Sequence, residues 1–188
     1  MFLSTESSKK IMRLLLKEKR NALPLERRKE ARIAVVSTLL PLLRPYKAIL
    51  SFHSLFDEID LTSLNQHLAE EGKLHLPKVD DDIMQVYCVK DPRQGLIEGK
   101  YKLQEPDPYK CLFIDVKNID CILVPGLGFD KHHRRMGYGK GHYDRLLAQL
   151  HQLSIFPKTI GVGFKEQYCD DDLPHEPHDI PLDEVKLF

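Results

Sequence analysis

The hydrophobic and polar positions of this chain follow two different periods, and each period predicts a type of secondary structure. Short apolar runs bounded by turn residues predict buried strands at 47–52, 73–76, 83–89, 111–116, 119–124, 158–163 and 184–188. Apolar positions three or four residues apart predict helices at 8–23, 24–43, 61–71 and from 140 onward. Because strands alternate with helices along most of the chain, the pattern predicts an α/β fold, a three-layer α/β/α sandwich with a mostly parallel sheet.

The first predicted helix combines an apolar face with a pair of basic residues. Ile11, Leu14 and Leu15 mark the apolar face. Lys9 and Arg13 are four residues apart, so they share a face one turn from the start of the helix. Spacing alone favours a solvated basic face for this pair. The functional alternative is that both side chains bind the same phosphate group.

Three segments of the chain lack a clear period. Residues 90–110 are rich in charged residues, glycine and proline, which predicts a long excursion with little regular structure, of the kind that can cover a site. The aspartates at 80–82 predict a solvated hairpin tip. His175 and His178 have a spacing that could bind a metal on a helix, but the prolines beside them predict a loop.

The strongest candidate site lies within 122–147, which reads ILVPGLGFDKHHRRMGYGKGHYDRLL. In a parallel sheet, ligands gather beyond the carboxyl ends of strands, which here means the loops after Phe52 and Val124. Glycines let backbone N–H groups approach a phosphate, and a helix N-terminus offers unpaired donors and a partial positive charge. The order of strand, glycine loop and helix therefore predicts a phosphate site, with Lys140 adding charge to the glycines Gly137, Gly139 and Gly141.

This loop matches neither of two well-known phosphate motifs. Lys140 is followed by glycine instead of Ser or Thr, so the loop is not a Walker A motif. The spacing Gly-x-Gly-x-Gly also lacks the two-residue gap of the dinucleotide fingerprint. The alternative to a phosphate site is a glycine-rich turn that only reverses the direction of the chain. Asp144, in the first turn of the following helix, is equally suited to complement the helix dipole or to supply an oxygen to Mg²⁺.

Composition and charge narrow the class of protein. The chain has 188 residues, which is ordinary for one domain, and 28 basic residues balance 28 acidic ones. A nucleic-acid binder would be more basic, so we expect no nucleic-acid partner. The absence of a long apolar run predicts no membrane span. The cysteines have no CxxC spacing, which predicts reduced thiols and a cytoplasmic protein; they are Cys88, Cys111, Cys121 and Cys169. We also expect a monomer in which residues 1–188 form a single domain.

The block VPGLGFDKHHRRMGYGKGHYDRLL resembles the signature of the 5-formyltetrahydrofolate cyclo-ligase family, also called 5,10-methenyltetrahydrofolate synthetases. The similarity covers nearly the whole chain, because it includes Lys9-x-x-x-Arg13, FDEIDL, GKLHLPKV, QEPDP and LPHEPHDIPLDEV. The resemblance implies a Rossmann-like fold and an enzyme that uses ATP and Mg²⁺. Such an enzyme closes the formyl group of 5-formyltetrahydrofolate onto N10, giving 5,10-methenyltetrahydrofolate, ADP and phosphate. The formyl oxygen would attack the γ-phosphate, and N10 would then displace phosphate.

The same resemblance implies a role for individual residues. Lys140 and Arg135 would act on the transferring phosphoryl group. The ATP contacts would be Lys9, Arg13, Arg134, Arg135, Met136, Gly137, Tyr138, Gly139, Lys140, Gly141, His142 and Tyr143. The folate would be held by His53, Glu58, Met84, Tyr138 and His142. Glu58 would accept hydrogen bonds from the paired donor edge of the pterin. Magnesium would be held by Asp144 and Asp179.

The chain departs from the family pattern at a few positions. His133 stands where glycine is usual, and His142 stands where an aromatic tyrosine is common, so the pH dependence of the site could differ. Two other classes stay open at this level. One is a sugar-phosphate isomerase or acyl-CoA transferase that uses the loop for a fixed phosphate. The other is a non-enzymatic RNA- or nucleotide-binding module, against which the neutral charge argues.

Overall fold

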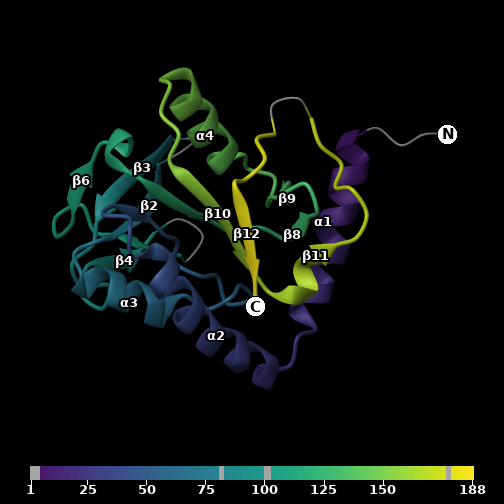
Figure 1. Cartoon of the computed structure of the whole chain (residues 1–188), viewed down its shortest axis with the longest axis horizontal. Coiled ribbons are helices and arrows are strands. Elements are labelled where there is room, and N and C mark those ends of the chain that lie inside the picture. Colours follow the sequence, from purple (N-terminus) through teal and green to yellow (C-terminus); the bar gives the residue numbers. More distant parts are fainter. Residues whose placement is uncertain (1–4, 81–82, 100–102, 177–178) are drawn as a thin grey trace.

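The computed structural model describes residues 5–80, 83–99, 103–176 and 179–188, and a seven-stranded sheet runs through it (Figure 1). The strand order is β12–β10–β7–β1–β2–β3–β6. Neighbouring strands from β12 to β2 are parallel, and β3 is antiparallel to both β2 and β6. The predicted mostly parallel sheet is therefore confirmed. The strands are β1 (Ile49–Leu50), β2 (Leu74–Asp80), β3 (Ile83–Cys88), β6 (Leu112–Ile114), β7 (Cys121–Val124), β10 (Lys158–Gly163) and β12 (Glu184–Leu187).

Helices cover both faces of this sheet. Successive strand residues point to opposite faces, so Ile49 packs in a core with α2 and α3, whereas Leu50 packs in a second core with α4. The buried runs in β7 and β10 have the same cause, since neither face of a central parallel strand meets water. The three-layer α/β/α arrangement is confirmed, and its helices are α2 (Leu25–Leu43), α3 (Thr62–Glu70) and α4 (His142–Gln152).

Helix α1 (Thr5–Asn21) lies outside the three layers, beside a small second sheet (Figure 1). That sheet has the order β11–β8–β9 and consists of β8 (Gly128–Asp130), β9 (Arg135–Met136) and β11 (Tyr168–Cys169). Leu16 of α1 packs with Leu127, Met136 and Leu173 in a separate small core. The glycine loop follows β9 directly, so α1 and the small sheet support it from one side.

The apolar face predicted for α1 is not its buried face. Ile11, Leu14 and Leu15 have exposed fractions of 47%, 58% and 56%, whereas Lys9 is 6% exposed and Arg20 is 1% exposed. A cation can be buried where a partner compensates its desolvation, and both cations have carboxylate partners here. The solvated basic face that spacing favours is therefore wrong for Lys9.

Three segments contain strands that the sequence did not predict, and one of these strands is β11. The basic stretch before the glycines is the hairpin β8–β9, in which Phe129 pairs with Arg135. Within the predicted excursion 90–110, β4 (Leu96–Glu98) and β5 (Gln104–Pro106) form an antiparallel pair. Strands of two or three residues are too short to show a period of two, so these pairs leave little trace in the sequence. Between the predicted strands 111–116 and 119–124, the chain forms a 3₁₀ helix at Val116–Asn118.

Local interactions mark the start and the end of α3. Asp60 accepts a hydrogen bond at its Oδ1 from the N–H of Thr62, the first residue of α3, at 2.8 Å, while Leu61 stands at the N-cap position and gives no side-chain cap. Gly72 ends that segment with a φ of +70°, a conformation that glycine adopts without strain. Helix α2 runs past Pro41 to Leu43. Asp81, Asp82 and His178, on which two sequence predictions depend, lie outside the described residues.

A histidine in the left-handed region lies in the turn between β8 and β9. His133 has a φ of +58°, and its N–H donates to the carbonyl oxygen of Asp130 at 3.0 Å. This is the position where the family pattern has glycine. A side chain at such a φ costs about 1–2 kcal/mol, whereas glycine loses more chain entropy on folding. We therefore expect His133→Gly to raise the free energy of unfolding by up to about 1 kcal/mol.

Urea unfolding of His133→Gly and His132→Gly provides the measurement. His132 precedes it in the same turn and is not among the residues with a positive φ. Its replacement by glycine should therefore lower stability or leave it unchanged. Equal changes in the two variants would contradict the idea that backbone strain at His133 is the cause.

Candidate active site

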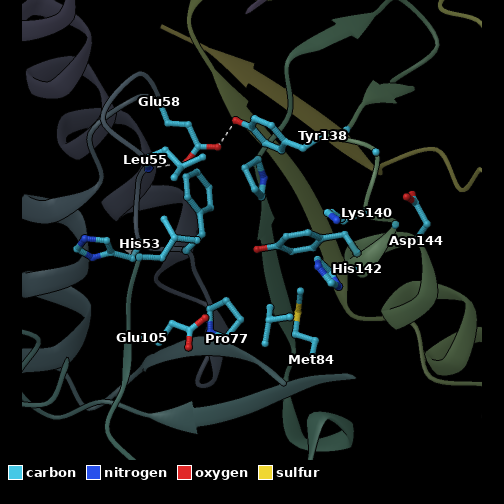
Figure 2. Close-up of a pocket in the computed structure, with 18 of the residues that line it drawn as sticks. His53, Leu55, Glu58, Pro77, Met84, Glu105, Tyr138, Lys140, His142 and Asp144 are labelled. Carbon is cyan, nitrogen blue, oxygen red and sulfur yellow. Dashed lines mark hydrogen bonds between the residues drawn. The ribbon is translucent and has the colours of Figure 1, made fainter. Parts of the chain in front are cut away.

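A cavity of about 260 Å³ lies at the carboxyl ends of β1 and β7. One wall is the loop after β1, and the opposite wall is the glycine loop with the first turn of α4 (Figure 2). Strands β2, β3 and β5 complete the lining with Pro77, Val79, Met84 and Glu105. The two loops that the sequence marked as candidates, one after Phe52 and one after Val124, therefore lie at the same hollow.

All five residues predicted to hold the folate line this cavity: His53, Glu58, Met84, Tyr138 and His142. Figure 2 shows His53 across the cavity from Lys140 and Asp144. Burial lowers the pKa of His53, so its imidazole is neutral near pH 7. The cavity that this neutral ring lines together with Pro77 and Met84 is suitable for a flat, polar-edged ligand.

Glu58 connects the two walls. Tyr138 donates a hydrogen bond to Glu58 Oε1, and the N–H of Leu55 donates to Oε2 at 2.8 Å (Figure 2). Burial raises the pKa of Glu58, and the hydrogen bonds from Tyr138 and Leu55 oppose that shift in part. Burial also raises the pKa of Tyr138, so its hydroxyl keeps its proton. The carboxyl of Glu58 is thus fixed in orientation, and it titrates at a higher pH than an exposed glutamate.

The glycine loop has a backbone that only glycine adopts without strain. Gly139 has a φ of +94° and Gly141 a φ of +67°. A Cβ at Gly139 would lie 3.3 Å from Cζ of Arg13, whose Nε donates to the carbonyl oxygen of Gly137 at 3.2 Å. Gly141 directly precedes α4, so the unpaired N–H groups of the first helical turn lie at the cavity wall. The structure has the order of strand, glycine loop and helix that the sequence predicts, with one hairpin inserted after β7.

Arg135 and Asp144 form an ion pair at the start of α4. The Nη2 atom of Arg135 lies 2.7 Å from Oδ1 of Asp144, and its guanidinium carbon lies 5.6 Å from the ring centroid of Tyr143. Both residues line the cavity. Among the described residues, no cluster of three or more His, Cys, Asp or Glu side chains forms a ready-made metal cage. Mg²⁺ commonly binds through one or two carboxylates together with substrate phosphates, and Asp144 fits that kind of site.

Several residues predicted to contact ATP or magnesium are not in the cavity wall: Lys9, Arg13, Arg134, Met136 and Asp179. Lys9 Nζ lies 2.6 Å from Oδ2 of Asp179 and 2.8 Å from Oε2 of Glu176. Burial lowers the pKa of Lys9, but the two carboxylates outweigh it and raise the pKa overall. Arg13 contacts the glycine loop through the carbonyl oxygen of Gly137, outside the cavity lining. The roles of these residues in binding ATP and Mg²⁺ stay predictions.

Two of these side chains have other partners in the structure. Met136 is buried with Leu16 and Leu173 in the small core beneath the loop. Arg134 Nη1 lies 3.8 Å from Oδ2 of Asp172, across the small sheet. The side chain of Met136 is therefore packed in a core, whereas Nη1 of Arg134 is buried without a hydrogen-bond partner among the described residues.

Three residues of this region were missed by the sequence analysis. Glu105 is buried in the cavity wall, and its Oε2 lies 3.3 Å from Nζ of Lys78. The QEPDP segment was part of the resemblance, and that was the available signal for Glu105. Arg20 and Asp57 form an ion pair behind Tyr138 with a distance of 2.5 Å between Nη2 and Oδ2. The arginine lies on α1 and the aspartate beside Glu58, so no local spacing connects them.

Comparison with known proteins decides which of the open interpretations holds. The model of the 5-formyltetrahydrofolate cyclo-ligase family matches residues 5–187. The chain belongs to this family. The 5-formyltetrahydrofolate cyclo-ligase of Mus musculus is 28% identical over 97% of this chain and 94% of its own length. The cyclo-ligase of Escherichia coli K12 is 26% identical over 91% of this chain and 95% of its own length.

Solved structures agree with this assignment. The 5,10-methenyltetrahydrofolate synthetase of Aquifex aeolicus is 32% identical and superposes with a TM-score of 0.81, covering 94% of this chain and 88% of that one. A synthetase from Mycoplasma pneumoniae has the same fold at 24% identity, with a TM-score of 0.73 over 94% of this chain and 96% of that one.

Membership in the cyclo-ligase family makes the protein an enzyme of the ligase class and supports 5,10-methenyltetrahydrofolate synthetase activity. A small-molecule folate fits this family as the substrate. The cyclo-ligase interpretation therefore takes precedence over the isomerase, acyl-transferase and RNA-binding alternatives. In the described part of the chain, the helices are too short or too polar to span a bilayer.

Proposed function

We propose that the protein catalyses the ATP- and Mg²⁺-dependent cyclisation of 5-formyltetrahydrofolate to 5,10-methenyltetrahydrofolate, with release of ADP and phosphate. The observation that carries this proposal is the shared cavity. The loop that bears His53 and Glu58 and the loop that bears Tyr138 and Lys140 line one hollow. A reaction that transfers a phosphoryl group onto a folate needs both ligands at one place, and this arrangement provides it.

The chemistry explains why the site needs cations and backbone donors. A formamide oxygen is a poor leaving group at neutral pH, so N10 cannot displace it directly. Phosphorylation of that oxygen turns it into phosphate, which leaves when N10 attacks the formyl carbon. Negative charge develops on the phosphoryl oxygens during transfer, and preorganised donors stabilise it. Lys140 and the N–H groups at the start of α4 would supply those donors, and Arg135 would add charge beside them.

On the folate side, the proposal assigns recognition to Glu58 and its neighbours. A carboxylate whose orientation is fixed by Tyr138 and Leu55 can accept from the paired N–H groups of a pterin. Met84 offers an apolar contact for the ring, and His53 and His142 offer polar edges. His142 stands beside the nucleotide loop, so it borders both ligands.

Magnesium would be held by Asp144 together with phosphate oxygens of the nucleotide, with Asp179 as a second carboxylate. When bound, the ion would neutralise charge on the phosphates. Asp144 contributes a carboxylate whose Oδ1 already accepts from Arg135 at 2.7 Å, which keeps the group oriented toward the loop. Asp179 accepts at Oδ2 from Lys9 and from the N–H of Glu176.

Asp144→Asn should weaken the response of the enzyme to magnesium. The amide keeps the size and an acceptor for Arg135 but removes the negative charge that attracts the cation. We expect the Mg²⁺ concentration for half-maximal rate to rise at least about tenfold. Asp170→Asn, which changes an exposed aspartate of the C-terminal segment, is the matched control. A magnesium titration that is the same in Asp144→Asn and wild type would remove Asp144 from the metal site.

A direct assay tests the proposed activity. The purified protein is mixed with ATP, Mg²⁺ and 5-formyltetrahydrofolate, and the growth of the methenyl product is followed by its absorbance. We expect product and inorganic phosphate to appear together, and omission of any one component should abolish both. Phosphate release that does not depend on the folate, or no methenyl product at all, would overturn the proposal.

We also propose that residues 1–188 act as a single domain and as a monomer in the cytoplasm. The family model spans 5–187, which supports one domain. Light scattering after size-exclusion chromatography tests the monomer. Because a related cyclo-ligase of Arabidopsis thaliana is named mitochondrial, the compartment is tested by fractionation of the source cells.

A further inference from the structure

A buried arginine lies behind the candidate site, outside the residues predicted to bind either ligand. Arg20 is 1% exposed, and its Nη1 donates to the Tyr138 hydroxyl at 2.5 Å and to the carbonyl oxygen of Gly126 at 3.4 Å. Its Nη2 donates to Oδ2 of Asp57 at 2.5 Å. One side chain therefore contacts the loop after β1, the loop after β7 and the glycine loop.

The chemistry of these groups fixes the direction of every hydrogen bond. Arginine has donors only, so the Tyr138 oxygen must accept from Arg20. The single hydroxyl proton of Tyr138 is then left to point at Glu58 Oε1, while the N–H of Leu55 points at Oε2. Both carboxylate oxygens of Glu58 are acceptors in this arrangement. The chain of bonds runs from Asp57 through Arg20 and Tyr138 to Glu58.

The burial of this cation is not explained by stability alone. Desolvation of an arginine costs free energy, and a buried ion pair is commonly no more stabilising than apolar side chains of the same volume. Four residues earlier on α1, Leu16 fills the equivalent position with an apolar side chain. The ring of Tyr138 also lies 5.4 Å from the guanidinium carbon of Arg20, so the arginine contacts both the ring and the hydroxyl.

We infer that Arg20, held in place by Asp57, is a positioning residue for the folate side of the site: it fixes the Tyr138 hydroxyl as a donor to Glu58 and so aligns the two walls of the cavity. This inference rests on the proposed function, because Glu58 is assigned there to the pterin. Arg20 touches neither ligand in this scheme and acts through Tyr138.

The charged and titratable groups around Glu58 come from four segments. Asp57 neighbours it on its own loop, Arg20 approaches from α1, Tyr138 comes from the glycine loop and Tyr143 from α4. Burial raises the pKa of Glu58, while the bond from Tyr138, the bond from Leu55 and the charge of Arg20 oppose that shift. Removing Arg20 or the Tyr138 hydroxyl should therefore raise the pKa of Glu58 further.

The kinetic test compares Arg20→Met, Arg20→Lys, Tyr138→Phe and the double variant of Arg20→Met with Tyr138→Phe. We expect Arg20→Met to raise the KM for 5-formyltetrahydrofolate roughly tenfold, with a much smaller change in the KM for ATP. Arg20→Lys keeps the charge but cannot reach two partners with a fork, so its KM should lie between wild type and Arg20→Met. In the double variant the two effects should not multiply, because both cut the same chain of bonds.

A second readout needs neither substrate nor activity. In protein with ¹³C-labelled glutamate, NMR follows the titration of the Glu58 carboxyl, which is assigned by its loss in Glu58→Gln. The pKa should rise in Tyr138→Phe and in both Arg20 variants. Arg32→Met is the control: it removes an arginine whose Nη1 lies 3.6 Å from Oδ2 of Asp60, close to Glu58 in the chain, and which forms no hydrogen bond or ion pair with Tyr138 or Glu58 in the described structure. If Arg20→Met fails to fold, Arg20→Lys and Tyr138→Phe carry the test.

The outcomes separate the positioning role from the proposed function. An unchanged pKa of Glu58 and an unchanged folate KM in the folded variants, in an enzyme that makes the methenyl product, overturns the role of Arg20. The role of Arg20 is also overturned if the effects of Arg20→Met and Tyr138→Phe on the folate KM multiply fully in the double variant. A wild-type protein without methenyl product overturns the function instead, and the NMR titration still reports on the bond chain.

Discussion

Replacing Lys140 by alanine should lower kcat by roughly 10²- to 10³-fold while the protein keeps its fold. Lys140 is exposed on the glycine loop and lines the cavity, so its loss creates no hole in a core. The neighbouring cations are already engaged, Arg135 with Asp144 and Lys9 with Asp179. Within the described residues, no carboxylate forms an ion pair with the ammonium group of Lys140, so its charge is available to a phosphate. The measurement is steady-state formation of the methenyl product at saturating ATP and folate.

The control for Lys140→Ala is Lys131→Ala. Lys131 lies in the turn between β8 and β9, and it pairs with Asp172 at 3.0 Å, away from the cavity. It carries the same charge on the same stretch of chain, so a general loss of positive charge would affect both variants alike. We expect wild-type kcat for Lys131→Ala and an unchanged circular dichroism spectrum for both. A Lys140→Ala enzyme with normal kcat would end the assignment of this side chain to the transferring phosphate.

The parts of the fold that were predictable depend on local pattern. Ile49 and Leu50 show the reason: adjacent apolar residues in a central strand serve two different cores, so the run itself marks a strand buried on both faces. The glycine loop was predictable for a related reason. Gly139 and Gly141 adopt a backbone that other residues avoid, and this constraint is visible in the sequence as spacing.

The helix α1 was predicted, but its buried face was mispredicted because its burial is decided by partners far along the chain. Lys9 is buried against Asp179, which is 170 residues away in sequence, and Arg20 against Tyr138, which is 118 residues away. A hydrophobic pattern treats both cations as solvent-facing and Leu14 as core-facing. The structure reverses this because carboxylates and a hydroxyl compensate the cations, and the apolar side is the one left to solvent.

The candidate site shows the same division. Spacing identified the glycine loop, and the predicted sheet pointed to the loop after Phe52, whereas the individual residues His53 and Glu58 entered through the family resemblance. Glu105 lies on a three-residue strand within a segment that sequence patterning described as irregular. Its place in the cavity wall follows from the pairing of β4 with β5, which only the folded chain reveals.

Replacing Glu58 by glutamine should impair folate binding far more than ATP binding. The amide keeps the volume of the side chain but offers one acceptor oxygen in place of two, and it carries no charge for the donor edge of a pterin. Hydrogen bonds to charged groups contribute about 1.5–3 kcal/mol each, so the KM for 5-formyltetrahydrofolate should rise roughly tenfold or more. The KM for ATP should change little, because a glutamine can still accept the hydrogen bond from the Tyr138 hydroxyl, through which Glu58 contacts the nucleotide loop.

The pH dependence of the folate KM distinguishes the loss of this carboxylate from a general loss of folded structure. Burial raises the pKa of Glu58, so as pH falls the carboxylate protonates earlier than an exposed glutamate and loses one of its acceptors. The wild-type KM for the folate should therefore rise as pH falls through that raised pKa, and Glu58→Gln should lack this limb. Glu70→Gln, which changes an exposed helical glutamate outside the cavity, should keep it. An identical acid limb in Glu58→Gln and wild type, or equal changes in the KM for ATP and folate, would place the pterin elsewhere in the cavity.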